Sequence, residues 1–119
     1  MIVAIDFDDT IAECAFPGIG AEIPGAVDTI KLIISRGHRV ILHTCRTNFE
    51  TDGHRPLDEA VEWLRARGIE LYAVNDNPVS RMKYGAQSKV YADLYIDDRG
   101  FGTPKVNGRV DWAAIRRFF

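Results

Sequence analysis

The chain has 119 residues, of which 46% are hydrophobic and 27% are charged, and its formal net charge is -2. This length suits one domain with a real core, and the composition is that of an ordinary globular protein. The small negative charge excludes a general electrostatic attraction to nucleic acid or to anionic membranes. No apolar stretch could span a bilayer and the first residues lack a signal-peptide pattern, so we expect a cytoplasmic location.

The first half of the chain predicts a strand, a loop, a helix and a second strand. Residues 2–8 begin with an Ile- and Val-rich run, which is typical of a strand buried on both faces. Residues 12–24 contain two prolines and two glycines and predict a loop or a short flap. Residues 26–36 carry apolar side chains on one helical face, and Gly37 ends that helix. Residues 38–44 predict the second strand.

The second half of the chain continues this alternation after a polar loop at residues 45–55. Proline, glycine and Asn-Gly signals mark its boundaries. The elements expected there are a helix that opens at Pro56 and stops at Gly68, a strand at 69–74, one or two helical turns within 79–88, a strand at 92–97, a hairpin around Asn107-Gly108 and a helix at 112–118.

Alternating strands and helices predict an α/β fold: a three-layer, doubly wound, mainly parallel sheet in one domain over residues 1–119. In such sheets, ligands bind outside the carboxyl ends of the strands. The two cysteines, Cys14 and Cys45, lack metal-site spacing and stand in or beside apolar segments. We therefore expect both to be small buried thiols.

Three carboxylates follow the first strand within four residues: Asp6, Asp8 and Asp9. Like charges held this close repel one another, and burying them is costly unless a cation or a proton lies between them. The cluster therefore indicates either a divalent metal site or an Asp-rich turn, because Asp is also a good turn residue.

Polar residues also stand at the ends of the other strands. Thr44 ends the second strand, Lys89 precedes the fourth, and Asp97 and Asp98 end it. The two acid clusters should therefore meet at one edge of the sheet, with a hydroxyl and an ammonium group between them. Carboxylates are suitable ligands for Mg²⁺, and the remaining groups could surround a phosphoryl group.

The stretch Asp6-Phe7-Asp8-Asp9-Thr10-Ile11 resembles the first motif of the haloacid dehalogenase-like (HAD) hydrolases, Asp-x-Asp-x-Thr followed by an apolar residue. Thr44, Lys89 and the Asp97-Asp98 pair resemble the second, third and fourth motifs in order and in strand context. The resemblance covers the whole chain. It implies a HAD-like Rossmannoid core and, because an Asp stands at position 8, a phosphatase that hydrolyses phosphomonoesters.

The resemblance also implies roles for single residues. Asp6 would be the nucleophile that forms an aspartyl-phosphate, and Asp8 the general acid and then the general base. Mg²⁺ would be held by the Asp6 carboxylate, the main-chain carbonyl of Asp8 and Asp97. Asp98 would bind the metal through water or orient Lys89. Thr44 and Lys89 would bind the phosphoryl group, and Thr10 would brace the turn after Asp8.

The stretch between Asp6 and Thr44 is too short for the larger cap domain inserted there in many relatives, and the span from Thr44 to Lys89 leaves little room for a second type of cap. The chain therefore resembles the capless branch. A capless site is open, and a second subunit in a homo-oligomer, the 45–55 loop or a large substrate could cover it. Lys83 competes with Lys89 for the phosphate-site role. Arg46 could bind a substrate carboxylate or phosphate, or form a salt bridge with the acid cluster.

Two alternatives stay open. A phospho-acceptor receiver domain has a similar size and similar residue types, although its acceptor Asp follows the third strand and its Thr comes later. A HAD-like domain that only binds a partner or a metal is the other alternative. The substrate is not indicated, and sugar phosphates, nucleotides and phosphorylated macromolecules all fit.

Overall fold

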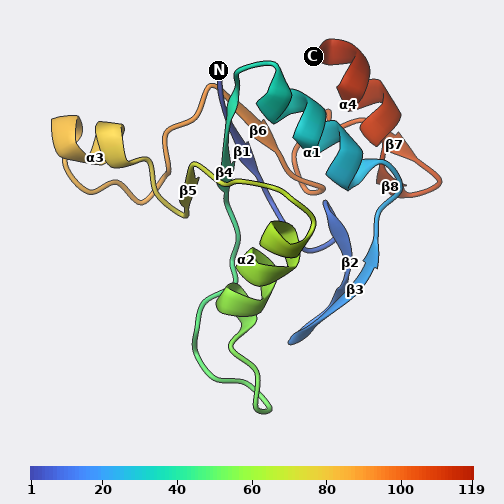
Figure 1. Ribbon diagram of the computed structural model, residues 1–119, viewed down its shortest axis with the longest axis horizontal. Coiled ribbons are helices and arrows are strands. Elements are labelled where there is room, and N and C mark those ends of the chain that lie inside the picture. Colours follow the sequence, from blue (N-terminus) through green and yellow to red (C-terminus); the bar gives the residue numbers. More distant parts are fainter.

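The computed structural model describes residues 1–119 and has a four-stranded parallel sheet as its centre (Figure 1). The strand order is β5-β4-β1-β6, with bounds Ala73–Val74, Arg39–Leu42, Ile2–Ile5 and Leu94–Ile96 respectively. The chain thus moves outward from β1 to β4 and β5, and then returns to place β6 on the other side of β1. The expected α/β fold with a parallel sheet is confirmed.

The register of the sheet brings the carboxyl ends of the strands to one level. Ile5 of β1 stands opposite Leu42 of β4 on one side and Ile96 of β6 on the other. Ile5 and Leu42 are almost fully buried, as expected for apolar residues at the centre of a covered sheet. Residues that directly follow β1, β4 and β6 therefore emerge along the same edge.

Four helices surround the sheet: α1 (Ala26–Ser35), α2 (Pro56–Ala66), α3 (Pro78–Tyr84) and α4 (Trp112–Phe118). Helix α1 packs against β4 and α4, and its apolar stripe includes the fully buried Ile30 and Ile33 (Figure 1). Gly37 and Gly68 follow α1 and α2 with φ of +88° and +81°, the left-handed conformation that ends many helices. None of the helices is long and apolar enough to cross a membrane.

Residues 12–24, which were expected to form a loop or a short flap, form an antiparallel hairpin of β2 (Ala12–Ala15) and β3 (Gly18–Glu22), so the loop alternative was wrong. Phe16 and Pro17 form its turn, so the proline that indicated a loop marks only the tip. Gly20 packs so tightly that a Cβ there would collide with the carbonyl of Glu13. The Asn-Gly hairpin is confirmed as β7 (Lys105–Val106) and β8 (Arg109–Val110).

The third strand is shorter than predicted. Of residues 69–74, only Ala73 and Val74 pair with β4, because this strand lies at the edge of the sheet and has a neighbour on one side only. The expectation of buried cysteines was also wrong. Cys14 is exposed on the hairpin and Cys45 is exposed in the loop after β4, so apolar neighbours in sequence did not indicate burial.

Candidate functional site

Three carboxylates converge at the carboxyl ends of β1 and β6. Asp6, Asp97 and Asp98 each offer an oxygen atom within 4.8 Å of the others. The backbone N–H of Asp6 donates to the carbonyl of Ile96 at 2.9 Å, which extends the β1–β6 pairing to the acids themselves. The convergence of the two acid clusters therefore follows directly from the pairing of adjacent parallel strands.

The Asp6 carboxyl group carries the clearest electrostatic signal in the site. Burial, the charge of Asp97 and a hydrogen bond with Asp98, in that order of importance, together raise its pKa to about 7. None of the three carboxylates forms a salt bridge with a Lys, Arg or His side chain. A bound cation would relieve both the repulsion and the burial cost.

Thr10 joins the two acid clusters. Its hydroxyl oxygen lies 3.0 Å from Oδ2 of Asp6 and 3.2 Å from Oδ1 of Asp98, and it accepts the backbone N–H of Asp98 at 2.9 Å. One hydroxyl hydrogen can serve one carboxylate at a time. Thr10 is fully buried, and its own carbonyl accepts the indole N–H of Trp112 at 2.8 Å. Thr10 thus connects the turn after β1 with Asp98 beyond β6 and with Trp112 at the start of α4.

Thr44 follows β4 at the same edge of the sheet. Its backbone N–H donates to the side-chain oxygen of Asn75 at 2.8 Å, and its hydroxyl oxygen accepts the backbone N–H of Arg46 at 3.1 Å. The hydroxyl hydrogen has no acceptor in the protein and can therefore point to a ligand. Sequence reasoning missed Asn75, which lies beyond β5 with a positive φ of 49°.

Arg46 pairs with Asp8, the second acid of the first motif. Nε donates to Oδ2 and Nη2 donates to Oδ1 of Asp8, both at 2.8 Å. Nη1 donates to the carbonyls of Pro17 and Pro56, and Nη2 also donates to the carbonyl of Gly18. Of the two alternatives for Arg46, the salt bridge is therefore the one present, and no N–H group is left for a substrate.

The surroundings of Arg46 are largely closed to water. Its side chain is only 1% exposed, whereas that of Asp8 is 23% exposed. The guanidinium carbon lies 5.2 Å from the ring centre of Phe7 and 5.3 Å from that of Phe16, in cation–π contact with each. The ion pair therefore has its cationic end buried and its anionic end open to the sheet edge.

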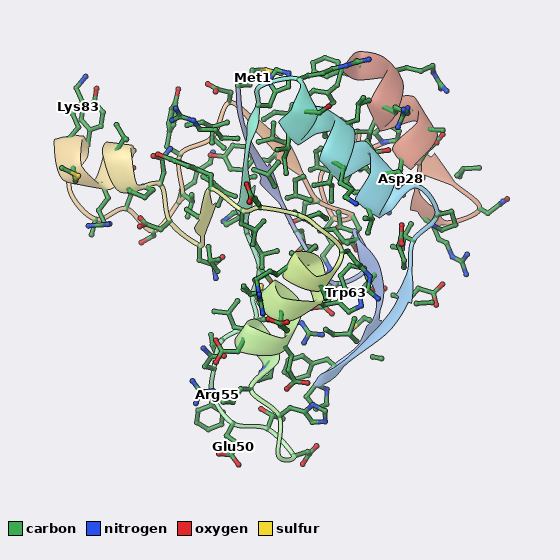
Figure 2. All side chains as sticks on the ribbon, in the orientation of Figure 1. Met1, Asp28, Glu50, Arg55, Trp63 and Lys83 are labelled. Atoms are coloured by element: carbon green, nitrogen blue, oxygen red, sulfur yellow. The ribbon has the colours of Figure 1, made fainter.

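Lys89 is exposed and does not contact the acids. Its Nζ lies 5.2 Å from the ring centre of Tyr95. Lys83 lies on the outer end of α3 (Figure 2) and lines a depression shared with Ile2, at the amino end of β1. Lys83 therefore lies at the end of β1 opposite to the site. Asp9 has a positive φ of 61° and its carboxylate accepts the N–H of Cys14, as expected of a turn residue.

Comparisons with known proteins connect the chain to one solved structure. No protein-family model and no curated protein matches the chain. The chain is similar to a conserved protein from Bacteroides thetaiotaomicron, with 44% sequence identity and a TM-score of 0.80. The match covers 99% of this chain and 88% of that chain. At this identity and coverage, the chain belongs to the same protein family as that conserved protein.

Proposed function

We propose that this chain is a Mg²⁺-dependent phosphomonoester hydrolase with a doubly wound, HAD-like core and no cap domain. The observation that carries the proposal is the convergence of Asp6, Asp97 and Asp98 without a basic partner. The hydroxyl of Thr44 and the Asp8 carboxylate follow the ends of β4 and β1, at the same edge of the sheet.

The residues present fit a magnesium ion. Mg²⁺ prefers oxygen ligands and is usually held by one or two carboxylates together with water and phosphate oxygens. The carboxylates of Asp6 and Asp97 would hold it with the main-chain carbonyl of Asp8, and Asp98 would contribute directly or through water. When bound, the metal would favour the ionised form of Asp6 and neutralise charge on the phosphoryl oxygens.

The proposed reaction has two steps. An oxygen of Asp6 attacks phosphorus, the bond from phosphorus to the leaving-group oxygen breaks, and Asp8 gives its proton to that oxygen. Water then attacks the phosphorus of the aspartyl-phosphate and loses a proton to Asp8. The bond between Asp6 and phosphorus breaks, which releases inorganic phosphate and restores both acids.

Two further side chains would bind the transferring group. The free hydroxyl hydrogen of Thr44 would donate to a phosphoryl oxygen. Lys89 would offset the charge of the nucleophile and the phosphate together, which requires its flexible side chain to leave Tyr95. Because no cap covers the sheet edge, a second subunit or the substrate itself would exclude bulk water.

The proposal is tested by phosphate release from p-nitrophenyl phosphate with Mg²⁺ present. We expect turnover that EDTA and Asp6→Asn abolish, while the same exchange at the turn residue, Asp9→Asn, leaves the rate unchanged. Asn tolerates the positive φ at position 9, so this control should fold. A folded wild-type protein without turnover under any divalent metal would overturn the proposal.

The same preparation separates the alternatives. A long-lived phosphorylated form without turnover, after treatment with acetyl phosphate, would indicate a receiver-like signalling domain. Metal binding without phosphorylation would indicate a domain that only binds. If the protein is active, a panel of phosphorylated metabolites would identify its substrate class. The molecular mass in solution would show whether the chain forms a homo-oligomer.

A further inference from the structure

We infer that Arg46 is a positioning residue that holds the general acid Asp8 and the tip of the β2–β3 hairpin in one fixed arrangement. This inference rests on the proposed function, because it assigns Asp8 the role of proton donor. Arg46 itself does not touch the reacting atoms, since its N–H groups are all engaged within the protein.

The first argument is the geometry of the ion pair. Two parallel hydrogen bonds of 2.8 Å run from Nε and Nη2 of Arg46 to the two oxygens of Asp8. A two-bond contact between planar groups fixes the plane of the carboxylate as well as its distance, which a single bond from a Lys would not do. After Asp8 has given up its proton, the resulting carboxylate would face a partner already in place.

The second argument is that the same guanidinium holds the hairpin. Nη1 and Nη2 donate to the carbonyls of Pro17 and Gly18 at 3.1 Å and 2.6 Å, and Nη1 also reaches Pro56 at the start of α2 at 3.2 Å. Phe16, at the hairpin tip, packs its ring over the guanidinium and is about half exposed (51%). A displaced guanidinium would therefore move the acid and the hairpin tip together.

The third argument is the choice of a charged group. Burying a charged guanidinium is costly. Neutral donors could satisfy the three backbone carbonyls, so these carbonyls do not explain why a charged side chain stands here. The open part of the pair is the Asp8 carboxylate, whose side chain is 23% exposed while that of Arg46 is 1% exposed. The buried cation thus stands behind a carboxylate that faces the site, where it would stabilise the charge that Asp8 carries after donating its proton.

Leaving groups of different quality provide the test. Protonation by Asp8 matters most for an alkyl phosphate, whose leaving alcohol is a poor leaving group, and little for p-nitrophenyl phosphate. General acid catalysis contributes about 10²–10⁴-fold. We expect Arg46→Lys, which keeps the charge but loses the two-bond contact, to lower kcat/KM for an alkyl phosphate about 10²-fold and kcat/KM for p-nitrophenyl phosphate only a few-fold. The ratio kcat/KM reports the step in which the leaving group departs, and not the later step, common to both substrates, in which Asp8 acts as base.

Two controls separate positioning from general damage to the fold. Arg65→Lys makes the same exchange in an exposed ion pair with Glu62 on α2 and should leave both rates unchanged. In an Asp8→Asn background, Arg46→Lys should have little further effect on either substrate, because the acid it positions is gone. Guanidinium ion, at concentrations that leave the fold intact, should partly restore the alkyl phosphate activity of Arg46→Gly.

The outcomes distinguish failure of this inference from failure of the proposed function. If wild-type protein hydrolyses neither substrate, the proposed function fails and the role of Arg46 fails with it. If wild-type protein is active, equal losses of kcat/KM on both substrates, full activity of Arg46→Lys, or an undiminished effect in the Asp8→Asn background would each overturn the positioning role alone.

Discussion

The indole N–H of Trp112 donates a 2.8 Å hydrogen bond to the carbonyl of Thr10, across 102 residues of sequence. Trp112 opens helix α4 and is 1% exposed, so this bond is sheltered from water. Because the Thr10 hydroxyl contacts both Asp6 and Asp98, the C-terminal helix is connected to the acid cluster through a single residue.

Replacing Trp112 by Phe should destabilise the protein by about 1–3 kcal/mol, because the buried carbonyl of Thr10 loses its donor. Urea denaturation followed by circular dichroism measures this change. Trp63→Phe is the matched control, since Trp63 is only partly buried and its indole N–H makes no hydrogen bond within the protein. Equal losses in the two variants would show that packing, and not the hydrogen bond, is responsible.

Replacing Thr10 by Val should raise the pKa of the Asp6 carboxyl above about 7. The hydrogen bond from the Thr10 hydroxyl lowers that pKa, against the larger effect of burial, and Val removes the hydrogen bond at nearly constant volume. Carbon NMR of the carboxyl groups in metal-free protein would follow the titration. Thr10→Ser keeps the hydroxyl and should titrate like the wild type.

The metal-free protein should lose stability as pH rises from about 4 to about 7. The folded-state pKa of Asp6 is raised to about 7, so in this range the folded protein holds a proton that the unfolded chain has released. The contribution is fully present below about pH 4 and is lost as pH passes through the folded-state pKa. Asp6→Asn should flatten this part of the pH dependence of the free energy of unfolding.

Magnesium should raise the melting temperature of the wild-type protein at pH 8 by several degrees, because the ion binds the folded carboxylate cluster and not the unfolded chain. Asp97→Asn should remove most of the increase. Asp52→Asn serves as the control, since Asp52 lies in the 45–55 loop with a positive φ of 49° that Asn also tolerates. An equal increase in both variants would place the metal elsewhere.

The central sheet could be predicted because its strands are apolar runs that stop at charged or polar residues. Asp6 and Asp97 were expected at one edge for the same reason, and the structure places them there. The hairpin at β2 and β3 could not be predicted, because its strands are partly exposed and the conspicuous Pro17 belongs to its turn.

The supporting contacts of the site could not be predicted because they depend on long-range packing. Nothing in the sequence distinguishes the Arg46 that binds Asp8 from an arginine that binds substrate, since both require only a guanidinium near the edge. The amide of Asn75 and the indole of Trp112 act through partners 31 and 102 residues away. The sequence around Asn75 indicates only a turn, and the sequence around Trp112 indicates only a buried aromatic residue.

The hydrogen bond from Thr44 to Asn75 makes the position of Thr44 independent of the 45–55 loop that follows it. Asn75 is itself held by the carbonyl of Leu42 at 2.8 Å, so the backbone of Thr44 is fixed by the neighbouring strand and not by the loop that follows it. That loop, residues 45–55, ends in its own small turn at Thr51–His54. Beyond Arg46, insertions there could evolve to admit new molecules while the hydroxyl of Thr44 stays in place.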